Sequence, residues 1–165
     1  MSIAGFLAFA AGAAHAQTLP PVGLRLEGMS YVLAEGGEVQ LTVEAHRAEV
    51  APGAGRIALR GVRARVVSAP EGSGTGGLEL VCERGELDLA NGEFVARGKV
   101  AGRTPSGRTL RTEQLRYVHA RGLISGDAPV AMSDDSGDYR GGGFRYWVRE
   151  DRFRLSGGAR IVQGD

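Results

Sequence analysis

Apolar and polar side chains alternate with a period of two along most of the chain beyond residue 22. Clear examples run through residues 41–46, 56–60, 62–66 and 78–83, in which every second side chain is apolar. Successive side chains of a β-strand point to opposite faces, so this pattern is typical of strands that separate an apolar interior from water. No long stretch repeats its apolar positions at helical spacing. We therefore predict an all-β fold.

Turn-forming residues separate the alternating runs, and glycine makes up 27 of the 165 residues, about twice its usual share. A weak repeat covers residues 84–100, 112–130 and 142–160, spaced about 28 residues apart, with a fainter copy at 47–62. Each copy has the length of one hairpin and carries a glycine late in its second strand, at Gly61, Gly98, Gly126 and Gly157. Glycine there permits a bulge or a sharp bend. The repeat predicts successive antiparallel hairpins in one sheet that curls around an interior.

The N-terminal segment differs in character from the rest of the chain. Residues 3–14 are apolar and are followed by Ala14-His15-Ala16, which resembles a signal-peptide cleavage site. The apolar run is shorter than the roughly 20 residues that span a bilayer, and no Lys or Arg precedes it. We predict a signal peptide at 1–16 and one exported domain at 17–165, with a remnant of a membrane anchor as the alternative for the first segment.

The remaining patterns argue against catalysis, metal binding and nucleic-acid binding. The formal net charge is +1 with both signs interspersed, whereas nucleic-acid binding needs a concentrated basic face. His46 and His119 lie in separate runs without metal-motif spacing, and the lone Cys82 can form neither an internal disulfide nor a cysteine zinc site. We expect no metal, no cofactor, no nucleic-acid partner and no enzymatic activity. The many carboxylates leave open one alternative, a glycosidase-type carboxylate pair.

Several short stretches carry a family pattern: 110–117 (LRTEQLRY), 124–130 (ISGDAPV), 141–146 (GGGFRY) and 155–161 (LSGGARI), with 23–28 and 44–50 upstream. These stretches resemble the LptC family, the periplasmic components of lipopolysaccharide export. The resemblance covers residues 22–162, and its motifs are shared with the sibling periplasmic bridge protein LptA. LptC itself normally keeps an N-terminal transmembrane helix, which the short segment at 1–16 does not match.

The resemblance implies a single, partly open β-jellyroll whose apolar interior holds the acyl chains of lipopolysaccharide. It implies a periplasmic location and leaves open an anchor in the inner membrane. The expected partners are lipopolysaccharide, the inner-membrane lipopolysaccharide ABC transporter (LptB/LptF/LptG) and an LptA-like bridge protein that docks by edge-strand pairing. The protein would receive lipopolysaccharide from the transporter and pass it toward the outer membrane. Two alternatives remain open: a soluble LptA-like bridge protein, and a structural β-module with a filled core and no ligand.

Two sets of candidate residues follow from the alternation and the resemblance together. The candidate lipid-groove residues are the inward apolar positions Leu41, Val43, Ile57, Leu59, Leu78, Leu80, Leu87, Leu115, Tyr117, Phe144, Tyr146, Phe153 and Leu155. The candidate docking edges are residues 22–33 toward the transporter, with Leu24, Leu26 and Tyr31, and residues 153–162 toward the next bridge protein, with Leu155, Ala159 and Ile161.

Overall fold

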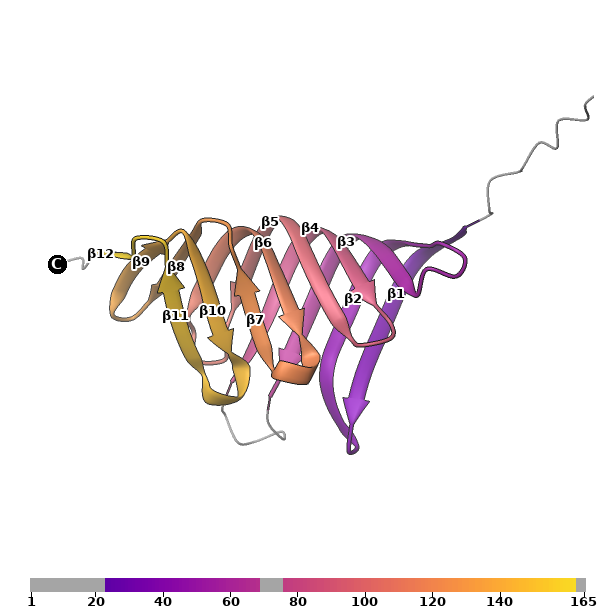
Figure 1. Ribbon diagram of the computed structural model, residues 1–165, viewed down its shortest axis with the longest axis horizontal. Coiled ribbons are helices and arrows are strands. Elements are labelled where there is room, and N and C mark those ends of the chain that lie inside the picture. The colour runs from indigo at the N-terminus through magenta and orange to yellow at the C-terminus, as the bar shows by residue number, and fades with distance from the viewer. Residues whose placement is uncertain (1–22, 69–75, 163–165) are drawn as a thin grey trace, which may run out of the picture.

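The computed structural model describes residues 23–68 and 76–162, and the prediction of an all-β fold is confirmed (Figure 1). The strands are β1 (Leu24–Glu35), β2 (Glu38–Val50), β3 (Arg56–Val67), β4 (Gly77–Asp88), β5 (Glu93–Arg103), β6 (Thr109–Val118), β7 (Leu123–Gly126), β8 (Val130–Asp134), β9 (Gly137–Gly141), β10 (Gly143–Trp147), β11 (Arg152–Ser156) and β12 (Arg160–Val162). Two single-turn 3₁₀ helices, η1 (His119–Arg121) and η2 (Val148–Glu150), connect strands. Within the described residues, no helix is long and apolar enough to cross a membrane. The segment 1–16 and Val22 lie outside the described residues.

All twelve strands belong to one antiparallel sheet. The first six strands pair in sequence order, as the predicted succession of hairpins requires. The sheet then divides at β6, because residues 116–118 pair with β7 whereas residues 109–112 pair with β8. One branch continues as β7–β10–β11 and the other as β8–β9–β12. β1 and β12 therefore lie at opposite ends of the long axis of the molecule (Figure 1).

A crease crosses the sheet at right angles to the strands. The backbone pairing between neighbouring strands is interrupted at the same height along each of the first six strands. The unpaired residues are 28, 46, 61, 83, 98–99 and 113. Gly61 and Gly98 have φ values of 60° and 78°, a left-handed conformation that glycine adopts without steric strain. Beyond β6 the crease continues through the links between the two branches, next to Gly126 and at Gly157. The glycines of the internal repeat are therefore the residues at which the sheet bends.

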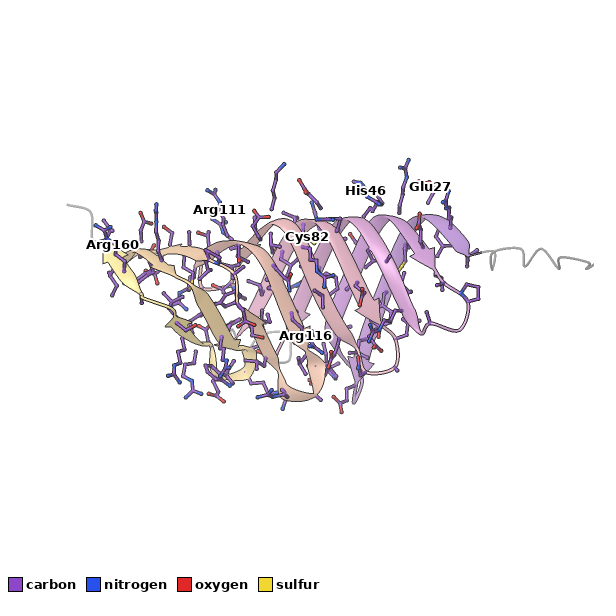
Figure 2. The ribbon with its side chains drawn as sticks, turned by 45° about the horizontal axis from the view of Figure 1, so that its top comes forward. Glu27, His46, Cys82, Arg111, Arg116 and Arg160 are labelled. Atoms are coloured by element: carbon purple, nitrogen blue, oxygen red, sulfur yellow. The ribbon has the colours of Figure 1, made fainter. Side chains whose placement is uncertain are left out.

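The crease divides the sheet into two facing walls. The first wall comprises residues 29–45, 62–68, 76–82, 100–112, 130–141 and 160–162, and the second comprises 24–27, 47–60, 84–97, 114–126 and 143–156. Arg111 and Arg116 both belong to β6, but Figure 2 shows Arg111 at the upper edge and Arg116 on the front face, because the crease lies between them. The inward side chains of both walls form one apolar core.

Candidate lipid groove between the two walls

The candidate groove is the apolar interior between the two walls. Eleven of the thirteen sequence-predicted groove residues are buried there: Leu41, Val43, Ile57, Leu59, Leu78, Leu80, Leu87, Leu115, Tyr117, Phe144 and Tyr146. The other two, Phe153 and Leu155, lie on β11 and are half-buried against the same core. Every residue of the set therefore lines one interior. In the middle of the molecule, the side chains of the described residues fill this interior themselves.

The sequence-based set misses several side chains that line the same interior. Phe94 and Ile124 are fully buried, and Leu110 is 2% exposed. Each stands at an inward position of its strand, so the same alternation could have identified all three. Phe94 matters most, because its ring packs beneath Gly85, where an added Cβ would lie 2.8 Å from the ring. The glycine at that position makes room for an aromatic ring in the interior.

Among the described residues, the free margins of the walls, opposite the crease, meet at three places that we call ties. The first tie joins the end of β1 to η1, where His119 Nε2 lies 3.3 Å from Glu35 Oε2. His119 Nδ1 lies in turn 3.2 Å from the Tyr117 hydroxyl inside the second wall. Burial raises the pKa of Tyr117 to about 12, which keeps that hydroxyl neutral. The first tie therefore connects the interior to the margin of the opposite wall.

The second tie is the most deeply buried. The hydroxyl of Tyr146, on the second wall, accepts a hydrogen bond from Gly77 N–H of the first wall at 3.1 Å. It donates to Asp151 Oδ1 at 2.9 Å, with the Gly77 carbonyl as another acceptor at 3.2 Å. Burial raises the pKa of Tyr146, so the hydroxyl keeps its proton. One side chain thus satisfies the backbone of the opposite wall.

The third tie lies near the C-terminal end of the groove. The Arg108 guanidinium, at the margin of the first wall, lies 5.0 Å from the ring centroid of Phe153 on the second wall. Its Nε donates to Asp134 Oδ2 at 3.1 Å. A hydrogen bond from Ser136 N–H, together with Arg108, holds the pKa of Asp134 below its usual range. Phe153 also stacks on Tyr146 at 3.9 Å between centroids, which joins the second and third ties.

The apolar interior is less completely covered at its two ends. The half-buried apolar side chains that pack against the core are Leu26, Met29, Tyr31 and Leu33 of β1, Tyr139 of β9, and Phe153 and Leu155 of β11, together with Val50 at the end of β2. At the C-terminal end, a recess of about 560 Å³ opens between Met132, Tyr139, Phe153 and Leu155, with charged side chains around it. The core is therefore accessible at its ends rather than along its middle.

The candidate docking residues lie on strands that have a free side, except for Ala159, which lies in the link between β11 and β12. β1 pairs only with β2, β11 only with β10, and β12 only with β9 among the described strands. Leu24 and Ile161 are 59% and 65% exposed, and Ala159 is also exposed. Leu26, Tyr31 and Leu155 are half-buried. Both ends of the sheet thus present unpaired backbone next to partly exposed apolar side chains.

The chemistry of this site is burial of apolar groups. Among the described residues, no cluster of His, Cys, Asp and Glu has the geometry of a metal site. Burial raises the pKa of Cys82 to about 11, so its thiol is protonated and unreactive near neutral pH. What the arrangement offers is a dry interior between the two walls of one sheet, closed at the three ties and open at both ends.

Comparison with known protein families gives one match. A family model described as "Lipopolysaccharide-assembly, LptC-related" matches residues 23–163. The matched range contains both walls, the crease, the three ties and both ends of the sheet. No curated protein matches the chain.

Proposed function

This chain belongs to the LptC-related family of lipopolysaccharide-assembly proteins, and from that premise we propose that it carries lipopolysaccharide between the two membranes as a bridge component. In this proposal, the inner-membrane ABC transporter (LptB/LptF/LptG) delivers the lipid, and the bridge passes it toward the outer membrane. The acyl chains lie between the two walls, and the sugar head group stays in the water of the periplasm. The exported domain would begin near residue 17.

The physical basis of the proposal is the hydrophobic effect. Each acyl CH₂ group withdrawn from water gains about 0.8 kcal/mol, so a lipid with several chains cannot cross an aqueous compartment unshielded. The observation that supports the proposal best is the distribution of burial in the core. The core is closed in the middle of the molecule, yet half-buried apolar side chains extend it to both ends of the sheet. An amphipathic ligand that moves along the molecule needs such a path.

The free strands at each end are the proposed docking sites. A partner strand that pairs with β1 would extend the sheet and the interior toward the transporter, and pairing at β11 or β12 would extend them toward an LptA-like protein. Unpaired strands are normally a hazard, because they also template unwanted association. Head-to-tail pairing of this kind does not close on itself, so it can build a continuous bridge.

Acyl chains can enter the middle of the groove only if the two walls separate. Tyr117 is 3% exposed and Tyr146 is fully buried, so lipid and side chains cannot occupy that space together. Separation of the walls would break the contacts at Glu35, Gly77 and Arg108. We therefore propose that loading begins at an open end and proceeds as the ties release.

Photo-crosslinking in intact cells tests the proposal. A photoreactive amino acid replaces inward Tyr117 or Phe153, and the matched controls replace their outward neighbours Arg116 and Arg154. We expect lipopolysaccharide adducts at both inward positions, with more at the open end. Adducts only at the outward positions would refute the carrier function. The same probe at Leu26 and Ile161 should capture the transporter and the LptA-like protein respectively.

The filled middle of the interior favours one other function, a structural β-module without a ligand. Its core would need no opening, and its free strands would serve only assembly. Native mass spectrometry of the protein purified from membranes separates the two possibilities. A mass increase equal to one lipopolysaccharide molecule supports the carrier, whereas the bare chain mass in every preparation supports the structural module.

A further inference from the structure

Four arginines stand side by side on the outer surface of the second wall. The antiparallel register places Arg47 opposite Arg60, Arg60 opposite Arg84, and Arg84 opposite Arg97. All four side chains are exposed. Adjacent strands are about 4.8 Å apart, so the row, which we call the arginine ladder, spans about 14 Å. Like charges directly opposite one another destabilise a sheet, so this arrangement calls for a compensating partner.

Several other charged positions of the outer surface show the opposite arrangement. Arg25 pairs with Glu49 at 3.5 Å, Arg56 with Asp88 at 3.4 Å, and Arg65 with Glu79 at 3.4 Å. In each pair, an arginine on one strand stands opposite a carboxylate on the neighbouring strand. These pairs show that this sheet places complementary charges next to each other over much of its outer surface. Single like-charge pairs also occur, at Arg145–Arg154 and at Arg140–Arg160. The arginine ladder differs from these in having three consecutive like-charge pairings.

Three members of the arginine ladder lack an ion-pair partner. Arg47, at one end, is neutralised by Glu27 at 3.2 Å. In the part of the chain that the structure describes, Arg60, Arg84 and Arg97 make no ion pair with any carboxylate. The nearest acidic side chain along β4, Glu83, is held by Lys99 at 2.9 Å. Within the described residues, three guanidinium groups in a row therefore have no carboxylate within ion-pair distance.

The same arginines line one side of a shallow hollow of about 200 Å³. Its floor includes Ala58 and the backbone of Gly85, which present no large side chain, and Glu49 and Glu86 stand on its side away from the crease. The hollow thus offers cationic donors along one side and carboxylate acceptors along the other. It lies on the outer surface, separated from the acyl interior by the sheet itself.

We propose that the arginine ladder is a binding site for a phosphorylated saccharide. Guanidinium groups bind phosphate oxygens through paired, charge-assisted hydrogen bonds, and a rigid sheet holds three such groups at fixed spacing. Glu49 and Glu86 use Oε1 to pair with Arg25 and Arg56, each at 3.5 Å, and their Oε2 atoms accept hydrogen bonds from sugar hydroxyls. The bound phosphate supplies the negative charge that the sequence omits between Arg60, Arg84 and Arg97.

The shape and charge of the site favour this ligand over two other anionic partners. A flat anionic bilayer would bring its surface charge against Glu49 and Glu86 as well as the arginines, and a hollow gives it no added contact. An acidic peptide running on past the hollow would meet the same two carboxylates. A single sugar phosphate presents its charge on one side and hydroxyls on the other, which matches the two sides of the site.

The inference extends the proposed function and rests on it for the source of the ligand, the phosphorylated sugars of a lipopolysaccharide head group. The head group concerned would lie outside the groove that holds the acyl chains. A probe without acyl chains has no reason to enter the groove. Binding of such a probe therefore tests the arginine ladder alone, whereas the photo-crosslinks from Tyr117 and Phe153 test the groove alone.

The test is a titration of the isotope-labelled full chain with glucosamine 1-phosphate, followed by NMR of the arginine Nε–H groups. We expect saturable shifts at Arg60, Arg84 and Arg97. Arg84→Gln should weaken binding about tenfold, because one charged hydrogen-bonding group is lost. The matched control Arg65→Gln removes the same charge from a pair outside the arginine ladder and should leave the affinity within about twofold.

Two further arms decide what kind of anion the site takes. Tighter binding of the sugar phosphate than of inorganic phosphate supports the proposal, and equal binding of the two means an adventitious ion only and overturns it. Preference for a hexaglutamate peptide, or for anionic phospholipid vesicles, also overturns it. Arg84→Glu should abolish sugar-phosphate binding and yet raise the melting temperature, because it restores alternating charge; a loss of binding with a lower melting temperature would point to damaged folding and count against the site.

Discussion

The middle of the groove and its C-terminal end are built from the same alternating pattern, but they differ in accessibility. In the middle, Leu115 of β6 has strands on both sides and a wall opposite, and it is fully buried. At the C-terminal end, Leu155 of β11 also points inward, but β11 has a partner strand on one side only, and the leucine is half-buried. Whether an inward side chain is sealed thus depends on how many neighbours its strand has.

This difference separates two tasks within one core. The sealed middle stabilises the fold, because it buries most of the large side chains that the described residues bring together. The open ends contribute less to stability, but they present apolar surface that a ligand or a partner strand can cover. The same kind of substitution should therefore reduce stability more in the sealed middle, and reduce binding more at the open ends.

Leucine truncation should produce the largest contrast. Leu115→Ala should lower the free energy of unfolding by about 3 kcal/mol, since it leaves a cavity in a packed core. Leu155→Ala should lower it by less than about 1 kcal/mol, because water already reaches that site. Urea unfolding followed by circular dichroism measures both values. Equal losses would mean that the two regions do not differ in packing, and the contrast would fail.

Thiol reactivity should show the next largest contrast. Burial raises the pKa of Cys82 from 9.0 to about 11, so its thiolate population near neutral pH falls on the order of 100-fold. A thiol-specific reagent should therefore modify Cys82 at least that much more slowly than a cysteine placed at the open end by Leu155→Cys in a Cys82→Ala chain. Similar rates at the two positions would show that the middle opens readily.

The same pKa shift fixes the sign of a pH effect on stability. In the unfolded chain the Cys82 thiol ionises near its ordinary pKa of 9.0, whereas in the folded chain it keeps its proton up to about 11. The folded state therefore binds more protons in that interval, and the contribution of Cys82 to stability, complete below the lower value, falls as pH rises. Cys82→Ala should make the loss of stability over this interval less steep.

Local sequence features account for most of the fold. Alternation and turn residues predicted the strands and hairpins, and the repeated Gly61 and Gly98 lie at the bends, because each of these signals spans only a few residues. The division of the sheet at β6 has no such signal, since it depends on which of two later strands pairs with each half of one strand. Pairing between strands far apart in the sequence therefore determines this part of the architecture, which local patterns could not predict.

The candidate site shows the same limit. Inward residues such as Leu41 and Tyr146 could be identified from alternation, and so could Phe94, which the sequence-based set omits. The hydrogen bond between Tyr146 and Gly77 joins residues 69 positions apart and carries no motif. The arginine ladder could not be predicted from the sequence either, because arginine is common in this chain. Only the strand register places Arg60, Arg84 and Arg97 side by side.

Removal of a tyrosine hydroxyl gives the smallest contrast and tests the ties themselves. Tyr146→Phe should lower the free energy of unfolding by about 2 kcal/mol, because Gly77 N–H and the Asp151 carboxylate lose their partner at a buried site. Tyr139→Phe at the open end removes a hydroxyl whose only hydrogen bond among the described residues is to Asp134 at 3.3 Å, and it should change stability by less than about 0.5 kcal/mol. If the ties restrain loading, Tyr146→Phe should also raise the yield of lipopolysaccharide crosslinks at position 117, with unchanged yield in Tyr139→Phe. A destabilised Tyr146→Phe chain whose crosslinking stays at the wild-type level would show that the second tie holds the walls together without controlling entry.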